Sequence, residues 1–303
     1  MIKPIEVIDR QTGKIEQEEV YFGEIIELLY GNSWTSRSFG RVLTYLFCHF
    51  PFISAFFGWW NQLPLTKKKI DPFIRRYKLD TSEFLEPVES FPSFNDFFIR
   101  KLKAESRPIA SSKKMAIIPA DGRYLFYPNI AQSDGFIVKG EKFHLADLVR
   151  CESLAQKYEQ GTLVIARLCP TDYHRYHFPV DCIPGITKQI NGYLYSVNPM
   201  ALKKDIQILT KNKRTLCQLN SEEFGDVIFI EVGATNVGSI NQTYVSRKPY
   251  QKGEEKGYFS FGASTILILF EPNRIKIDPD LLAASSKKIE MRCLMGQQLG
   301  GIA

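Results

Sequence analysis

From about residue 115 onward, the chain alternates short β-rich runs with turns made of Gly, Pro, Asn and Asp. Runs of this length, bounded in this way, predict β-strands. The predicted strands are residues 115–118, 123–127, 135–138, 163–168, 186–194, 227–233, 243–247 and 265–270, and one helix is expected at residues 143–158. The chain before this region is expected to be helical. We therefore expect an α+β fold in which N-terminal amphipathic helices cover a mostly antiparallel β core.

The most hydrophobic stretch lies in the N-terminal part, at residues 42–60. Its length is nominally sufficient to cross a bilayer. Pro51 interrupts it and His49 adds polarity, so two short helices with one apolar face each are the better prediction. Three lysines follow at residues 67–69. Aromatic side chains beside a cationic cluster favour an anchor at the membrane interface. Two core helices with solvated lysines remain the alternative.

Composition and charge set wider limits. A chain of 303 residues with 44% hydrophobic residues can bury one large core. The 39 basic and 33 acidic residues give a net charge of +6, which suits an anionic lipid surface and equally an ordinary soluble protein. The basic residues are spread along the chain, so nucleic acid is not an expected partner. The six cysteines show no C-x-x-C spacing and are expected to be free thiols. Neither a secretory signal nor a transit peptide is visible at the N-terminus, so we expect the mature protein to begin near Met1.

A small-residue patch near the C-terminus, residues 261–265, places Ser264 where a Gly-punctuated loop enters the apolar run 266–270. A serine hydroxyl held against the preceding carbonyl can drive an N→O acyl shift, and elimination followed by hydrolysis then converts the serine into a pyruvoyl group. A small residue before Ser-Thr at the entrance of a strand is also ordinary turn chemistry. The patch alone leaves both interpretations open.

Two further segments bear on this choice. Residues 168–179 contain His174 and His177, two of the four histidines, and Asp121 lies in a Pro/Gly turn after an apolar run. A lone histidine favours a structural role, but two histidines three residues apart can point into one cleft. The pair has no third ligand at a compatible spacing, so a zinc site is not expected.

These three segments together resemble the phosphatidylserine decarboxylase family, in its branch with a Gly-Gly-Ser-Thr-like cleavage motif. The resemblance extends to residues 94–103, 196–199 and 232–240, in the family's order, and covers about residues 20–275. It implies a pyruvoyl-dependent carboxy-lyase of phospholipid biosynthesis. Two departures stand out. Ala263 replaces the usual Gly before the serine, which would cost energy if that residue needs a positive φ, and Lys213 replaces Glu in an Asn-Glu-Arg motif.

The resemblance also implies residue roles. Self-cleavage between Ala263 and Ser264 would give a large chain of residues 1–263 and a small chain of residues 264–303. Asp121, His177 and Ser264 would form the self-cleavage triad, and Ser264 would become the covalent pyruvoyl cofactor. That group would form a Schiff base with phosphatidylserine and release CO₂ to give phosphatidylethanolamine, with His174 as the general acid.

The expected organisation follows from these roles. Residues 1–110 would form a helical, membrane-associating region, and residues 111–303 a β-rich catalytic domain. The partners would be phosphatidylserine in an anionic membrane and the two chains of one precursor as a heterodimer, with a homodimer of heterodimers as an option. The location would be peripheral, on the cytoplasmic face of the cell membrane, in a bacterium. Arg175, Lys139 and Arg167 are candidates for holding the substrate phosphate, although each is more often a surface charge.

Two other functions use the same features differently. A serine hydrolase would employ an Asp, a His and a Ser but usually carries a Gly-x-Ser-x-Gly elbow, which is absent here. A membrane-binding scaffold without activity would not need Ser264. An unbroken chain would favour these alternatives, whereas a break after residue 263 would favour the decarboxylase.

Overall fold

The computed structural model describes residues 5–18, 27–29, 31, 40, 51–132, 137–138, 141–142, 144–202, 205–234, 239–262 and 264–303. Several features singled out from the sequence lie outside this part of the chain. They are residues 42–50 of the hydrophobic stretch, Lys139, residues 235–238 and Ala263.

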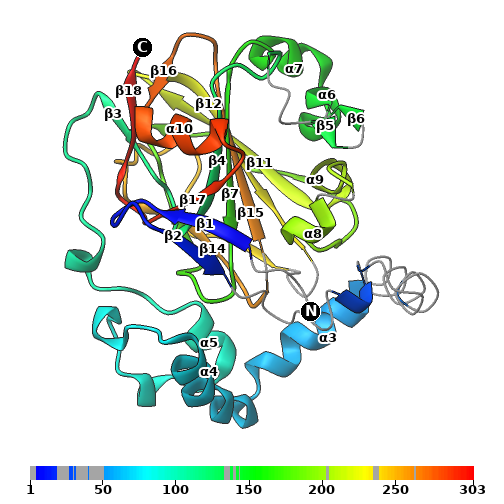
Figure 1. The fold of residues 1–303 in the computed structure, drawn as a ribbon, viewed down its shortest axis with the longest axis vertical. Coiled ribbons are helices and arrows are strands. Elements are labelled where there is room, and N and C mark those ends of the chain that lie inside the picture. The colour runs from blue at the N-terminus through cyan, green and yellow to red at the C-terminus, as the bar shows by residue number, and fades with distance from the viewer. Residues whose placement is uncertain are drawn as a thin grey trace.

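A ten-stranded sheet forms the centre of the described structure (Figure 1). Its strand order is β10-β11-β12-β15-β7-β4-β17-β1-β2, with β9 paired to β11, and every pairing is antiparallel except that of β1 with β17. The strands are β1 (Ile5–Asp9), β2 (Ile15–Glu18), β4 (Gly122–Tyr127), β7 (Thr162–Leu168), β9 (Ile183–Pro184), β10 (Lys188–Ile190), β11 (Arg214–Ser221), β12 (Gly225–Val232), β15 (Ser264–Phe270) and β17 (Glu290–Cys293). The predicted α+β class is confirmed.

Smaller sheets accompany the main one. They contain β13 (Ile240–Gln242), β14 (Glu255–Phe259) and β8 (Arg175–His177); β16 (Ile275–Ile277), β18 (Gln298–Ile302) and β3 (Met115–Ile117); and β5 (Ile137–Val138) with β6 (Glu141–Lys142). The helices are α3 (Pro51–Gln62), α4 (Ile70–Tyr77), α5 (Phe94–Phe98), α6 (Leu145–Val149), α7 (Glu152–Tyr158), α8 (Pro199–Leu202), α9 (Ile208–Lys211) and α10 (Pro279–Ser286), with 3₁₀ turns at Pro64–Lys69, Thr81–Glu83, Val88–Ser90 and Ala104–Ser106.

The central strand β15 is buried along its whole length, because both faces of the main sheet are covered. Ile266 and Ile268 point into one hydrophobic core, which also receives residues of β8, β14, β16, β18 and α10. Leu267 and Leu269 point into a second core, shared with α6, α7, α8 and α9. Figure 1 shows these two sets of elements on opposite sides of the sheet. A strand buried on both faces reads as a continuous apolar run, as this one does in the sequence.

The sequence did not reveal two strands at the N-terminus. β1 and β2 form a hairpin, and β1 pairs in parallel with β17, so this hairpin extends the main sheet beyond β4 and β17. Residues 1–110 were expected to be helical. Strand β1 is only partly buried, and β2 is largely exposed and polar, so the alternation of apolar and polar side chains gives a weak signal.

Three predicted elements differ from those observed. The predicted helix 143–158 is two helices, because Arg150 ends α6 in the left-handed conformation with φ of 52°. The predicted strand 186–194 is reduced to the three residues of β10. Strand 243–247 was wrong, since the strand in this region is β13, which ends at Gln242.

The N-terminal helices have an aromatic core of their own. It consists of Ile70, Phe73, Phe84, Phe91, Phe94, Phe97, Phe98 and Phe261. Ser93 caps α5 by accepting a hydrogen bond from the Asp96 N–H at 3.3 Å. Phe261 is the member of this core that belongs to the C-terminal patch. The aromatic core therefore joins the helical region to the entrance of β15.

The helix α3 leaves large apolar side chains in solvent. Phe56 and Trp59 are each more than half exposed, and Phe57 and Trp60 are also exposed. Lys67 and its two lysine neighbours follow in the 3₁₀ turn after α3. None of the helices in the described residues is both long and apolar enough to span a membrane.

Candidate active site

Ser264 is the first residue of β15, and it is fully buried. Its Cα is paired with that of Leu168 in β7, and the next residue, Thr265, is paired with Val232 in β12. Among the residues that the structure describes, the Ser264 and Thr265 hydroxyl oxygens have no hydrogen-bond partner. Buried hydroxyl groups normally form hydrogen bonds, so two adjacent ones without partners indicate a functional rather than a structural role.

The turn before Ser264 is held by α5. The Phe261 N–H donates to Asn95 Oδ1 at 3.2 Å, and the Phe261 ring packs against Phe94 and Phe98 with centroids 5.4 and 5.1 Å apart. Gly262 has φ of 141°, a conformation that L side chains rarely adopt. The positive φ seen in this turn therefore falls on a glycine.

His174 lies beside this turn and is completely buried. Its Nδ1 donates to the Asp172 carbonyl at 3.0 Å, so the proton is on Nδ1 and Nε2 carries the lone pair. Burial lowers the pKa of His174 to about 4, although the negative charge of Asp172 acts to raise it. The backbone of Gly262 also acts to raise this pKa, so it lies near the ring. Among the described residues, however, Nε2 has no partner at hydrogen-bond geometry. His174 is thus a neutral imidazole with a free nitrogen, and its ring packs against that of Phe98 with centroids 3.9 Å apart and planes tilted by 38°.

His177 is the last residue of β8, and both of its ring nitrogens have partners. Nδ1 donates to the Gly253 carbonyl at 2.9 Å, and Nε2 accepts from the Tyr173 hydroxyl at 3.2 Å. Burial lowers the pKa of His177, while the Gly253 carbonyl and the charges of Glu255 and Asp121 oppose this effect. Both ring nitrogens are therefore engaged, and Tyr173 occupies the nitrogen that would act as a base.

Asp121 lies just before β4, is buried, and forms an ion pair with Arg107. Its carboxylate accepts from Arg107 Nη2 at 2.6 Å and from the Met295 N–H at 2.8 Å. Within the described part of the chain, no hydrogen bond joins Asp121 to His177. The two groups are near enough for the charge of Asp121 to act on the pKa of His177. The structure thus places Asp121 near His177 without pairing them directly, and it places His174 beside the Gly262 turn.

A network of buried charges underlies the histidine segment, and the sequence analysis did not include it. Arg123 forms ion pairs with Asp172 and Glu18, and Arg167 pairs with Glu18 at 2.9 Å and with Glu290 at 2.6 Å. Burial acts to raise the pKa of Asp172, but the charge of Arg123 outweighs it and the pKa is lowered. The sequence did contain a sign of this network, because β4 and β7 are apolar strands that each contain one arginine, and a buried charge needs a partner.

Two of the candidate phosphate ligands are already paired within the protein. Arg167 belongs to the network above, and Arg175 pairs with Glu255 at 2.9 Å. A different arginine, Arg100, is buried without an ion pair. It hydrogen-bonds weakly to backbone carbonyls and stacks over Phe84 and Phe97, and burial lowers its pKa to about 10.

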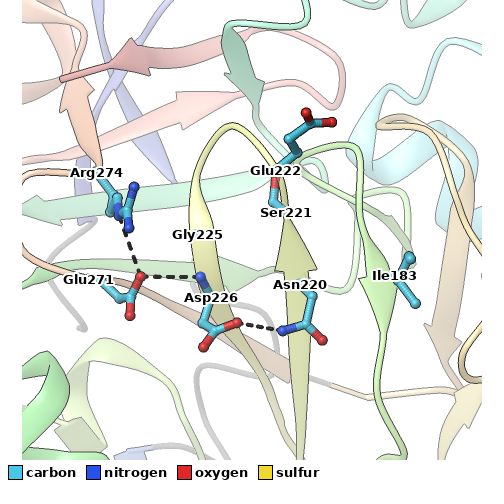
Figure 2. Close-up of a pocket in the computed structure, with 8 residues that line it drawn as sticks. All are labelled: Ile183, Asn220, Ser221, Glu222, Gly225, Asp226, Glu271 and Arg274. Atoms are coloured by element: carbon cyan, nitrogen blue, oxygen red, sulfur yellow. Dashed lines mark hydrogen bonds and ion pairs between the residues drawn. The ribbon is translucent and has the colours of Figure 1, made fainter.

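Figure 2 shows a surface pocket at the other end of the main sheet. It is lined by Ile183, Asn220, Ser221, Glu222, Gly225, Asp226, Glu271 and Arg274. This pocket lies where β12 begins and β15 ends, whereas Ser264 begins β15. The pocket is therefore separate from the candidate site. No group of three potential metal ligands occurs among the residues that the structure describes.

The comparisons with known proteins show the family of the chain. A family model described as phosphatidylserine decarboxylase matches residues 94–301. Proteins named phosphatidylserine decarboxylase proenzyme from Chlamydia caviae and Chlamydia felis are each 48% identical over 299 residues, which is 99% of this chain and 98% of theirs. The protein of that name from Chlamydia trachomatis serovar L2 is 41% identical over 293 residues, 97% of this chain and 96% of its own.

The family model and these relatives indicate a decarboxylase, an enzyme of the carboxy-lyase class. The chain belongs to the phosphatidylserine decarboxylase family.

Proposed function

We propose that the chain cleaves itself between Ala263 and Ser264 and then decarboxylates phosphatidylserine to phosphatidylethanolamine. The observation that carries this proposal is the Ser264 hydroxyl, which is buried, lacks a hydrogen-bond partner and directly follows the Gly262 turn. The word proenzyme in the names of the relatives supports a cleaved product. The products are a large chain of residues 1–263 and a small chain of residues 264–303.

The maturation step can be written with balanced atoms. Ser264 Oγ attacks the carbonyl carbon of residue 263, the peptide C–N bond breaks, and an ester and a free amine result. Loss of the Ser264 α-proton then expels the carboxylate of residue 263 and leaves a dehydroalanine at position 264. Its imine tautomer takes up one water and releases ammonia, which leaves a pyruvoyl group. An unpartnered hydroxyl suits the first step, because no hydrogen bond has to be broken before the attack.

We assign the proton transfers of maturation to His177, oriented by Asp121. Both side chains are buried, and the charge of Asp121 acts on the His177 ring. His177 Nε2 must leave the Tyr173 hydroxyl before it can accept the Ser264 proton. Asp121 must likewise share its carboxylate between Arg107 and the histidine. The assignment therefore requires a small rearrangement of this region during cleavage.

We assign His174 to the decarboxylation step, as the group that delivers a proton to the substrate carbon. The Ser264 hydroxyl oxygen and His174 Nε2 are both buried, and among the described residues neither has a hydrogen-bond partner in the precursor. These two positions therefore fit a pyruvoyl group. When formed, that group supplies an electrophilic carbonyl that takes the amine of phosphatidylserine and accepts the electron pair left by CO₂. Because His174 is neutral in the precursor, it must acquire a proton on Nε2 before it can act as an acid.

The membrane-facing part of the enzyme is proposed to lie within residues 1–110, and residues 111–303 to form the catalytic domain. The exposed aromatic residues of α3 and the three lysines after it support binding to an anionic membrane. The two chains should remain together after cleavage. β15 of the small chain is hydrogen-bonded on both sides to strands of the large chain, β7 and β12.

Four variants test these roles. Ser264→Ala should remain a single inactive chain, and His177→Ala and Asp121→Asn should remain largely uncleaved, with Asp121→Asn the milder. His174→Ala should mature into two chains but release CO₂ more slowly by about 10² to 10⁴. His144→Ala is the matched control, because His144 is exposed.

The measurements are intact mass under denaturing conditions and CO₂ release from phosphatidylserine. The small chain should lack an amino group at its N-terminus, so Edman sequencing should fail on it. A normal N-terminal serine on that fragment would exclude the pyruvoyl proposal. A fully active His174→Ala enzyme, or a normally maturing His177→Ala enzyme, would show that the two histidines are assigned wrongly.

A further inference from the structure

The turn before Ser264 is restrained at both ends. Downstream, Ser264 and Thr265 are held in the ladder of β15 between β7 and β12. Upstream, Phe261 is held by its backbone N–H and by its ring. Only Gly262 and residue 263 lie between the two restraints. The side chains of Ser264 and Thr265 do not hold the turn, because their hydroxyl groups have no partners.

One polar side chain contributes to the upstream restraint, together with the packing of the Phe261 ring. Asn95 is buried, with 7% of its surface exposed, and its Oδ1 accepts the Phe261 N–H at 3.2 Å. Burying an amide side chain in a short helix costs free energy unless it is hydrogen-bonded. An apolar residue would satisfy the packing of α5 equally well. The buried asparagine is therefore best explained by its bond to Phe261.

The helix that carries Asn95 is itself firmly positioned. Ser93 caps its first turn, and the Phe94 N–H donates to the Thr66 hydroxyl at 3.1 Å. Phe97 and Phe98 of the same helix are completely buried. A group on a packed and capped helix is held more accurately than one on a loop.

We propose that Asn95 is a positioning residue for self-cleavage, which holds Phe261 so that the Gly262 turn presents the carbonyl of residue 263 to Ser264. This inference rests on the proposed self-cleavage and adds a residue to it. Acyl transfer within a chain depends on holding the reacting atoms close together and aligned. Without the Asn95 bond, the turn gains freedom at its upstream end, and fewer molecules have the serine poised for attack. After cleavage, Phe261 and Ser264 are no longer joined, so Asn95 matters less for turnover.

The test compares the rate of conversion of the full-length chain in cell-free synthesis, followed on denaturing gels. Asn95→Leu keeps the size of the side chain but removes the acceptor, and it should slow conversion by roughly ten-fold. Asn95→Asp keeps an acceptor at the same place, and it should convert within about three-fold of the parent. Asn95→Ala removes the acceptor without adding bulk, and it repeats the test if leucine disturbs the packing of α5.

Two controls separate positioning from stability. Thr162→Val removes a buried hydrogen bond to the Pro128 carbonyl at the far end of β7, and it should lower the melting temperature without slowing conversion. Asn95→Leu protein that has fully matured should decarboxylate phosphatidylserine with a kcat/KM close to that of the parent. A purely structural role would instead reduce both rates with stability.

The outcomes are distinct. Conversion of Asn95→Leu and Asn95→Ala at the parental rate would overturn the inference and leave the proposed function intact. Equal slowing by Asn95→Asp and Asn95→Leu would also overturn it, because the acceptor would then not be what matters. A parent protein that stays one chain would refute the self-cleavage itself.

Discussion

Acid should destabilise the precursor through His174 in particular. The ordinary pKa of a histidine is 6.5, and burial lowers that of His174 to about 4. Between these values the unfolded chain binds a proton that the folded chain does not. The stabilisation is therefore complete above pH 6.5 and is lost as the pH falls toward 4. At about 1.4 kcal/mol per pKa unit, the full loss is about 3 kcal/mol, of which about 2 kcal/mol is lost by pH 5.

The assay is urea unfolding of the Ser264→Ala chain at several pH values between 7.5 and 5. This background keeps one covalent chain, and the range stays above the ordinary pKa values of Asp and Glu, 3.8 and 4.5. His174→Gln in the same background should be less stable at pH 7.5 but lose about 2 kcal/mol less on acidification. His144→Gln, which changes an exposed histidine, should behave as the parent.

Burial also lowers the pKa of His177, so part of the acid sensitivity should remain in the His174 variant. Equal losses of unfolding free energy in the parent and in His174→Gln would refute the reasoning. That result would mean that His174 is protonated in the folded chain at pH 5, or that water reaches it.

Three further outcomes are expected. Lys256 and Glu231 form a completely buried ion pair, so Lys256→Met leaves the Glu231 carboxylate without its cation and should lower the free energy of unfolding by about 3 to 5 kcal/mol. Adding Glu231→Gln should restore part of this loss, as measured by urea unfolding. Replacing Phe56 and Trp59 of α3 with serine should weaken sedimentation with anionic liposomes more than it slows conversion to two chains, and unchanged sedimentation would rule out α3 as the contact. The two chains should co-elute in native gel filtration and separate only in denaturant, and their separation in buffer alone would contradict the strand pairings of β15.

Much of the fold could be predicted from the sequence because its central strands are long apolar runs. Residues 163–168, 227–233 and 265–270 were expected as strands, and β7, β12 and β15 coincide with them to within two residues at each end. Local pattern is sufficient there, since burial on both faces demands apolar side chains throughout. β11, the hairpin β1–β2 and the short β13 were among the strands that were missed. β2 and β13 carry mostly polar side chains, and β1 is held in the main sheet by β17, which is distant in the chain.

The candidate site divides in the same way. The sequence by itself determined which side chains could take part, since Asp121, His174, His177 and Ser264 lie in recognisable local motifs. Only the tertiary structure decided which of their atoms are free. Whether a nitrogen or hydroxyl is free depends on groups far away in the chain, such as Arg107 on Asp121 and Tyr173 on His177. The bond from Asn95 to Phe261 spans 166 residues and exists only because the fold brings α5 against the entrance of β15.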